Sequence, residues 1–305
     1  MQRILIPFFT ILFLSSLSAQ EQKPFELNET WLSKITANAP SADINKEGDT
    51  KTILIFSLHT GFKHWTIPHT EAVVKILAEQ SGGFKVFLSK DISVFEKENL
   101  AQYDAVVLNN NCSIGDKRNL FWDVLKEDAS LTDTQRLEKA GILENNLLQY
   151  VDAGGGLMLL HGAIVMQNKS EAFGKMVGGS FDYHPKQQEI KVKLVDAAHP
   201  LVQAFKGKGF THIDEPYMFN NAYFDYNFRP LLYMEANQIV GKKAEVEDNI
   251  KYISWIKRYG SGRIFYASPS HNAQSYENPD LLAFLFDGMR YVVGDLTCDD
   301  SPMKQ

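Results

Sequence analysis

The feature that most constrains the fold is a series of continuous apolar runs in the first half of the chain. Such runs are typical of strands that are covered on both faces of a sheet. Between them lie segments with helical character, at about 68–80, 92–102 and 143–153. The runs are KTILIFSLH at 51–59, FKVFLS at 84–89, AVVLNNN at 105–111 and GLMLLH at 156–161. This alternation predicts an α/β fold built on a doubly wound, mostly parallel sheet.

The second half of the chain has a different pattern. EIKVKLVD at 189–196 alternates as a strand with one wet face does. Further extended stretches are expected at 212–220, 231–234 and 252–257, GRIFYASPS at 262–270 is again a buried strand, and an apolar helix at 279–293 closes the chain. AEVEDN at 244–249 is expected to be an exposed loop. These strands predict antiparallel additions to the parallel core within a single domain.

The first twenty residues have the organisation of a secretory signal peptide. Arg3 supplies a positive start, residues 4–14 are apolar, and residues 15–19 are mostly small. We therefore expect residues 1–20 to be a cleaved signal peptide, 21–50 an irregular leader, 51–295 the folded domain and 296–305 a tail. The protein is then periplasmic or secreted, without a stable membrane anchor, although an uncleaved anchor is an alternative. Export permits a disulfide between Cys112 and Cys298 but does not require one.

The charge of the chain argues against nucleic acid as a partner. Residues 1–20 contain Arg3 and no acidic residue, so their removal changes the formal charge from −6 to −7. A nucleic-acid-binding surface needs a basic face. A small-molecule partner fits better, and the sequence leaves a homo-oligomer open.

Polar side chains follow the predicted buried strands where ligands bind in open α/β sheets. The strand ends carry His59, Asn109 with Asn111, His161 and His271. Histidine serves as a general acid or base, or as a metal ligand. His59, His161 and His271 are therefore expected in one cleft, where they are candidates for binding Zn²⁺ or Mn²⁺. The alternative is a set of hydrogen-bonded core histidines, and a sealed position for His161 would argue against catalysis.

A second candidate segment contains two adjacent acids, Asp214 and Glu215, within an apolar and aromatic stretch. Either carboxylate could orient a histidine or move a proton, with Glu215 favoured, and the alternative is a structural hydrogen bond near Pro216. Nearby aromatic rings, including Tyr217, suit the apolar faces of sugars, and asparagine side chains suit hydroxyl groups.

The remaining histidines have simpler interpretations. His69 is expected on a helix surface, and His184 and His199 each precede proline, which favours a role in turn geometry. His212 lies in an alternating strand, where either role fits.

Several of these segments together resemble the ThuA-like, trehalose-utilisation proteins. The matching motifs are HTGFKHW at 59–65, GGGLMLLHGA at 154–163, GGSFDYHP at 178–185, DAAHPL at 196–201, DEPYMF at 214–219 and the run from 255 to 271. The resemblance implies a flavodoxin-like fold related to class I glutamine amidotransferases. It also implies a link to trehalose or other disaccharides, with oxidised 3-keto glycosides as candidate substrates.

The resemblance also indicates one reaction that this chain should lack. Glutamine amidotransferases of this class carry a nucleophilic cysteine in the turn G-x-C-x-G after a strand, and His161 stands at that position here. Acyl transfer through a thiolate needs a thiol at that place. Cysteine-dependent glutaminase activity is therefore not expected.

Two functional hypotheses follow. The first is an exported carbohydrate-active hydrolase, lyase or isomerase that uses histidine acid/base or metal-assisted chemistry. Its catalytic residues would be His161, His271 and Glu215, and its substrate-binding residues His59, His64, Asn109, Asn111, Asp214 and Tyr217. The second is a non-catalytic sugar-binding module on an amidotransferase-like fold, and a scaffold protein with a vestigial cleft is a further alternative.

Overall fold

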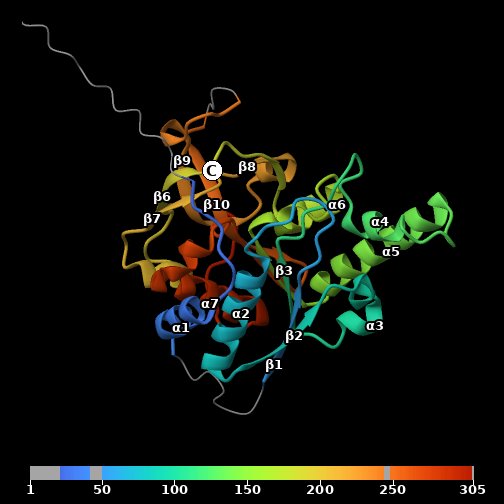
Figure 1. Ribbon diagram of the computed structural model, residues 1–305, viewed down its shortest axis with the longest axis horizontal. Helices are drawn as coiled ribbons and strands as arrows, with labels where there is room; N and C mark the ends of the chain where they lie inside the picture. The colour runs from blue at the N-terminus through green and yellow to red at the C-terminus, as the bar shows by residue number, and fades with distance from the viewer. Residues whose placement is uncertain (1–20, 42–49, 244–247, 304–305) are drawn as a thin grey trace, which may run out of the picture.

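The computed structural model describes residues 21–41, 50–243 and 248–303 (Figure 1). The predicted signal peptide lies outside these ranges, and so does most of the predicted loop at 244–249. Within the described ranges, no helix combines the length and the apolar character that crossing a bilayer requires.

The apolar runs of the first half form the parallel core of a nine-stranded sheet, as predicted. The strand order in this part is β2-β1-β3-β4-β11, and all four pairings are parallel. This is the 2-1-3-4-5 order of flavodoxin-like folds. The strands are β1 (Lys51–Phe56), β2 (Phe84–Ser89), β3 (Ala105–Asn109), β4 (Gly156–Leu160) and β11 (Gly262–Ala267).

The second half extends this sheet with antiparallel strands, which confirms the predicted α/β fold class. Next to β11 the order continues β10-β9-β6-β7, and every one of these pairings is antiparallel. A separate two-stranded sheet pairs β5 with β8. The strands are β5 (Ser180–Tyr183), β6 (Gln188–Leu194), β7 (Phe210–Asp214), β8 (Met218–Asn220), β9 (Arg229–Glu235) and β10 (Ile250–Tyr259).

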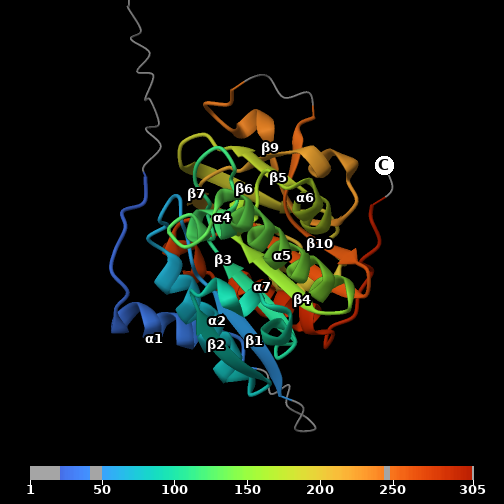
Figure 2. The same cartoon turned by 90° about the vertical axis from the view of Figure 1, so that its right-hand side faces the viewer.

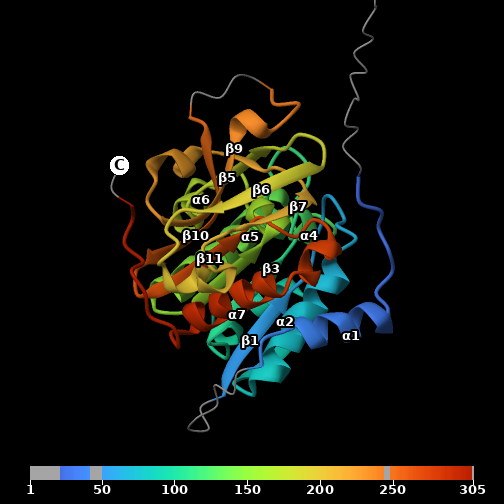
Figure 3. The ribbon, with the colours of Figure 1, turned by 90° about the vertical axis from the view of Figure 1, so that its left-hand side faces the viewer.

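Helices cover both faces of the sheet. Figure 2 shows α5 across one face, with α3 and α4 beside it, and Figure 3 shows α1, α2 and α7 on the opposite face. The helices are α1 (Glu29–Asn38), α2 (Ile67–Ser81), α3 (Lys97–Leu100), α4 (Leu120–Leu125), α5 (Asp133–Asp152), α6 (Glu171–Val177) and α7 (Pro279–Val293). Short 3-10 helices lie at Ile92–Phe95, His161–Val165, Pro200–Phe205, Asn221–Asp225, Ala236–Gln238 and Ala273–Glu277.

Local signals explain where these helices begin and end. The α2 and α7 helices each have a proline in the first turn, where a missing N–H costs nothing. They end at Gly82 and Gly294, which adopt the left-handed conformation that glycine tolerates best. At the start of α5, Thr132 and Gln135 form a reciprocal capping box.

The segment before the domain is not irregular throughout, which corrects the prediction for residues 21–50. Asn28 caps α1 by accepting a hydrogen bond from the backbone N–H of Trp31. The helix buries Trp31 and Ile35 in the main hydrophobic core. Few apolar residues mark this short helix in the sequence, and packing against the domain holds it in place.

Candidate functional site

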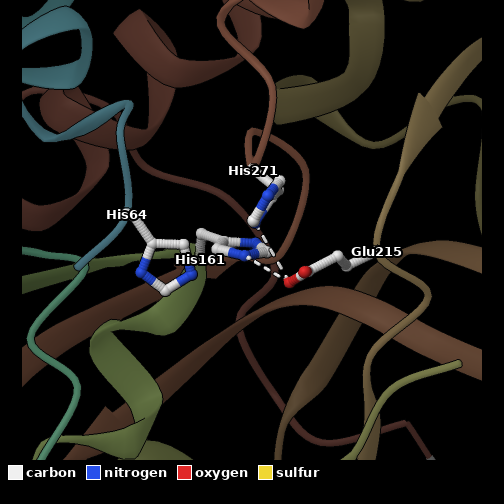
Figure 4. Close-up of side chains that lie close together, drawn as sticks. All are labelled: His64, His161, Glu215 and His271. Atoms are coloured by element: carbon white, nitrogen blue, oxygen red, sulfur yellow. Dashed lines mark ion pairs between the residues drawn. The ribbon is translucent and has the colours of Figure 1, made fainter. Parts of the chain in front are cut away.

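Four side chains from separate segments meet at one point in the structure (Figure 4). His64 lies between β1 and α2, His161 directly follows β4, Glu215 follows β7, and His271 follows β11. One ligand atom from each residue can be chosen so that all four lie within 4.8 Å of one another. We call these four residues the histidine–glutamate cluster. The three histidines meet because the parallel strands β1, β4 and β11 bring their carboxyl ends to the same edge of the sheet, and Glu215 reaches them from the antiparallel half.

Glu215 is the shared partner within the cluster. Its Oε2 atom lies 3.3 Å from Nε2 of His161 and 3.1 Å from Nδ1 of His271. Both of these ring nitrogens are buried, and neither is aligned for a hydrogen bond. The other carboxylate oxygen, Oε1, lies 3.7 Å from Nε2 of His184.

The backbone and one carbonyl fix the orientation of His161. Its φ angle is 48°, in the left-handed region, so the chain turns sharply as it leaves β4. Its Nδ1 atom lies 2.7 Å from the carbonyl oxygen of Ser268. A carbonyl can only accept, so Nδ1 carries the proton in this bond. The Nε2 atom of a neutral His161 therefore directs a lone pair toward Glu215.

The residue after His161 must be small. A Cβ atom placed on Gly162 would lie 2.7 Å from Cε1 of His64 and 2.9 Å from Sγ of Cys112. Both distances are shorter than real contacts of this kind. Gly162 thus permits His64 to approach the turn after β4.

Asp214 holds the loop that carries His271. Its carboxylate accepts hydrogen bonds from the backbone N–H groups of Ser270 at 2.7 Å, His271 at 3.1 Å and Glu215 at 2.8 Å. Ser270 has a φ of 121°, a strained conformation that these bonds help to maintain. The sequence suggested Asp214 for substrate binding, but the structure gives it this positioning role.

Burial and charge set the protonation of the cluster. Burial, together with His161 and His271, lowers the pKa of His64 well below its ordinary value, so this ring is neutral at pH 7. Burial alone would raise the pKa of Glu215, but His161 and His271 outweigh it and hold that pKa well below the usual range. Burial likewise opposes charge on His161, yet Glu215 and Asp214 raise its pKa overall. The cluster therefore contains a carboxylate that attracts positive charge.

The cluster is largely covered, with its remaining exposure on the Glu215 side. His161 has no exposed surface, whereas Glu215 keeps 9% of its surface and the side chain of His184 keeps 35%. The ring of Phe62, which is 61% exposed, lies over His64 and His271. Direct contact between His161 and a substrate, which its sequence position suggested, is thus not available in this conformation.

Tyr217 forms a wall of the site and is itself buried. Its ring centroid lies 4.3 Å from that of His161, and it stacks on His184 at 5.6 Å. Burial raises the pKa of Tyr217 well above its ordinary value, so its hydroxyl stays protonated.

His59 lies outside the cluster. It lines a pocket of about 740 Å³ together with His64, Lys63 and Trp65. The structure therefore brings His161 and His271 together as expected, but the third histidine beside them is His64. His64 belongs both to the cluster and to the lining of this pocket.

The two asparagines expected to bind hydroxyl groups instead hold the loop after β1. The amide of Asn109 donates to Oγ of Ser57 and to the carbonyl of Ile67, both at 3.0 Å. The amide of Asn111 donates to the carbonyls of Phe56 at 3.0 Å and Leu58 at 2.8 Å. Both side chains are fully buried, and their amide N–H groups are engaged in these structural bonds.

Other polar residues also differ from the sequence-based expectations. His69 is buried between Phe25, Trp31 and Trp65 and is not on a helix surface. The HP pair at 184–185 indicated a turn, and no simple pattern linked His184 to Glu215. The GGSFDYHP motif at 178–185 contains His184, and it was the available sequence signal because it is one of the motifs that carry the family resemblance.

The cysteines give no support to thiol chemistry. Cys112 and Cys298 are not paired with each other. Burial raises the pKa of Cys112 to about 12, with a further contribution from the charge of Glu215. Its sulfur lies 3.9 Å from Nδ1 of His64 and 3.5 Å from the carbonyl oxygen of Gly162 in the turn after β4, but Cys112 itself follows β3.

The strand order and the connections define a flavodoxin-like α/β protein, with a histidine in the sharp turn after β4. Within this class, the model of the ThuA family, described as trehalose utilisation, matches residues 52–292. The chain belongs to this family.

Solved structures agree with this assignment. A ThuA-like protein from Bacteroides uniformis aligns with a TM-score of 0.60 and 19% identity, covering 83% of this chain and 95% of that chain. A ThuA-like protein from Parabacteroides merdae aligns with a TM-score of 0.57 and 18% identity, covering 84% and 92%. At these identities the likeness concerns the fold alone. No curated protein matches the chain.

Proposed function

We propose that this chain is an exported enzyme of carbohydrate metabolism that acts on trehalose, another disaccharide or an oxidised, 3-keto derivative. Membership of a trehalose-utilisation family supports the substrate class. The pattern of residues 1–20 supports export and a periplasmic or secreted location. The observation that carries the enzymatic part is the ionised Glu215, held between two histidines at the carboxyl edge of the sheet.

The geometry divides the work among these residues. Glu215 keeps more exposed surface than the three histidines of the cluster, and His271 lies directly beside its carboxylate, so these two are the groups that would contact substrate. His161 is the positioning residue, because the carbonyl of Ser268 fixes its ring beside Glu215. Tyr217 packs against that ring and limits its movement.

A sugar ketone is a suitable substrate for such a pair. A base removes the proton from the carbon next to the carbonyl, the electrons of that C–H bond form a double bond to the carbonyl carbon, and the π pair of the C=O bond moves to oxygen as an enolate. In an elimination, the C=O bond re-forms, the electrons of the enolate double bond shift to the anomeric carbon, and the glycosidic carbon–oxygen bond breaks as its oxygen takes up a proton. Proton transfer by positioned side chains typically contributes 10²–10⁴-fold to the rate. Hydrolysis by a water activated at the same carboxylate is the other reaction that this arrangement permits.

The test is a product screen on trehalose and 3-keto disaccharides with the wild-type protein and two variants. Glu215→Gln keeps the shape of the side chain and removes its charge, and His271→Asn removes the ring. Each variant should lower kcat/KM by about 10²–10⁴-fold. Full activity in both folded variants would refute the assignment.

A sugar-binding module without catalysis is the second candidate, and the nearly complete burial of the cluster favours it. The two functions separate in one measurement. Calorimetry that detects sugar binding in solutions where no product accumulates supports the binding module.

A further inference from the structure

We propose that His64, His161, Glu215 and His271 together bind one divalent transition-metal ion. These residues offer three imidazole nitrogens and one carboxylate oxygen, all within 4.8 Å of one another. Zn²⁺ and Mn²⁺ are the ions that this mixed donor set suits best. The binding of the ion is argued from geometry alone, whereas its use in catalysis rests on the proposed function.

Two distances within the cluster are close to the edge length of a coordination polyhedron. Zinc binds nitrogen and oxygen ligands at about 2.0–2.2 Å, so neighbouring ligands of a tetrahedral ion lie roughly 3.3–3.5 Å apart. The two contacts of Glu215 are 3.3 Å, to His161, and 3.1 Å, to His271. A small outward shift of His271 would bring its distance from Glu215 into the same range.

The orientation of the ring nitrogens is the second argument. Buried polar atoms in proteins nearly always have a hydrogen-bond partner. Nε2 of His161 and Nδ1 of His271 have none, although both lie close to the same carboxylate oxygen. Both nitrogens are therefore free to act as ligands of an ion that lies beside this carboxylate.

The surroundings provide the support that metal ligands need. A ligating histidine usually donates its other N–H to a carbonyl or carboxylate, which fixes the ring. His161 does this through Ser268. Asp214 holds the backbone of both His271 and Glu215, so two of the other ligands share one anchor.

The donor set indicates the kind of ion. Imidazole favours Zn²⁺ and other transition metals, whereas Mg²⁺ and Ca²⁺ prefer sites built of oxygen atoms. The negative charge of the Glu215 carboxylate also favours a cation between these side chains. The proposed ligand set contains His64, whereas the sequence analysis suggested His59 as the third histidine.

Metal binding is tested on the full-length mature protein after treatment with a chelator. Zn²⁺, Mn²⁺ and Co²⁺ are added separately, and calorimetry and elemental analysis report affinity and stoichiometry. One ion per chain is expected for Zn²⁺ or Mn²⁺, and Co²⁺ should give the visible absorption of a site with nitrogen and oxygen ligands. None of these readouts depends on turnover.

Three variants locate the ion. Glu215→Gln, His271→Asn and His161→Asn should each weaken binding more than about 100-fold, which exceeds the usual effect of changing a supporting residue. Asparagine is chosen at position 161 because it tolerates a positive φ. His59→Ala is the matched control, because it removes a nearby histidine outside the cluster and should leave metal binding unchanged. Circular dichroism and thermal melting confirm that each variant is folded, and His64→Gln replaces any variant that is not.

The outcomes are distinct from those of the activity screen. Failure of the folded wild-type protein to bind any of the three ions overturns the proposal, and so does unchanged affinity in the folded cluster variants. A chelated protein that keeps full turnover while binding zinc at the cluster supports the metal site and refutes only its catalytic use.

Discussion

At the scale of single residues, the site depends on a few backbone conformations that hold side chains close together. His161 has a positive φ and Ser270 a strained one, and both belong to segments that converge on Glu215. Such strain persists only where surrounding contacts over-determine the conformation. Here the fixing contacts are the carbonyl of Ser268 and the carboxylate of Asp214.

Gly162→Ala tests how closely the cluster must pack. The new methyl group would collide with His64 and Cys112 and displace the ring of His64. Because small misplacements in a site cost about 100-fold in rate, we expect a loss of that size in kcat/KM. Gly141→Ala is the control, since nothing lies within 4 Å of its new Cβ. It lies inside α5, so it should stabilise the protein by about 0.5–1 kcal/mol. Equal activity in both variants would contradict the packing argument.

Asp214→Asn tests the anchor of the His271 loop. An amide keeps the size of the side chain but places an N–H donor against backbone N–H groups, which repel it. We expect metal affinity to fall about 10–100-fold, as it does for other supporting residues. Calorimetry with Zn²⁺ measures this, and Asp214→Glu is a second variant that retains the charge. Unchanged affinity in Asp214→Asn would show that the loop holds its shape without this carboxylate.

At the scale of elements, much of the parallel core could be predicted because each buried strand is a continuous apolar run. The strands β1, β3 and β4 are such runs, and the β-α-β alternation predicted that they belong to one mostly parallel sheet. The helix α1 could not be predicted in the same way, because its apolar residues are few and its stability comes from the domain beneath it.

The attachment of α1 can be measured. Trp31 is buried in the main core, so Trp31→Ala should lower the free energy of unfolding by about 3–5 kcal/mol. Loss of the helix cap in Asn28→Ala should cost about 1 kcal/mol. Denaturant unfolding measures both, with the exposed Thr30→Ala as the control. A Trp31→Ala protein as stable as the control would mean that α1 is not part of the folding unit.

The candidate site could be predicted only in part from the sequence, for a physical reason. Strand ends indicated His161 and His271, and the acidic pair indicated Glu215. The choice between His59 and His64 depends on the path of the loop after β1, which no periodic pattern reveals. Asn109 and Asn111 have the residue type of ligand-binding groups, but their amides are used by nearby backbone carbonyls.

At the scale of the whole molecule, the sheet has a parallel half and an antiparallel half that both contribute to the site. His64, His161 and His271 come from the parallel half, whereas Glu215 follows β7 at the far edge of the antiparallel half. The segment after β7 must therefore cross back toward β4 and β11. The carboxylate of the cluster thus comes from a part of the chain that the five-stranded flavodoxin-like core does not contain.

The whole chain should also lack thiol chemistry and a disulfide. We expect two titratable thiols per chain in denaturant, with or without prior reduction, since Cys112 and Cys298 are not paired. Glutaminase activity sensitive to a thiol alkylator should be absent, because His161 occupies the nucleophile turn. Thiol counting and a glutamine hydrolysis assay measure these two expectations. A count of no titratable thiols before reduction would contradict the first expectation. Glutamine hydrolysis that is sensitive to a thiol alkylator would contradict the second.

The central claim is that Glu215, held between His161 and His271, is the reacting group for a carbohydrate substrate. The most direct test compares wild-type and Glu215→Gln proteins for product formation from 3-keto disaccharides and trehalose, at equal folded concentration. The account predicts turnover by the wild-type protein and a loss of at least about 100-fold in the variant. Turnover that survives unchanged in Glu215→Gln would contradict it.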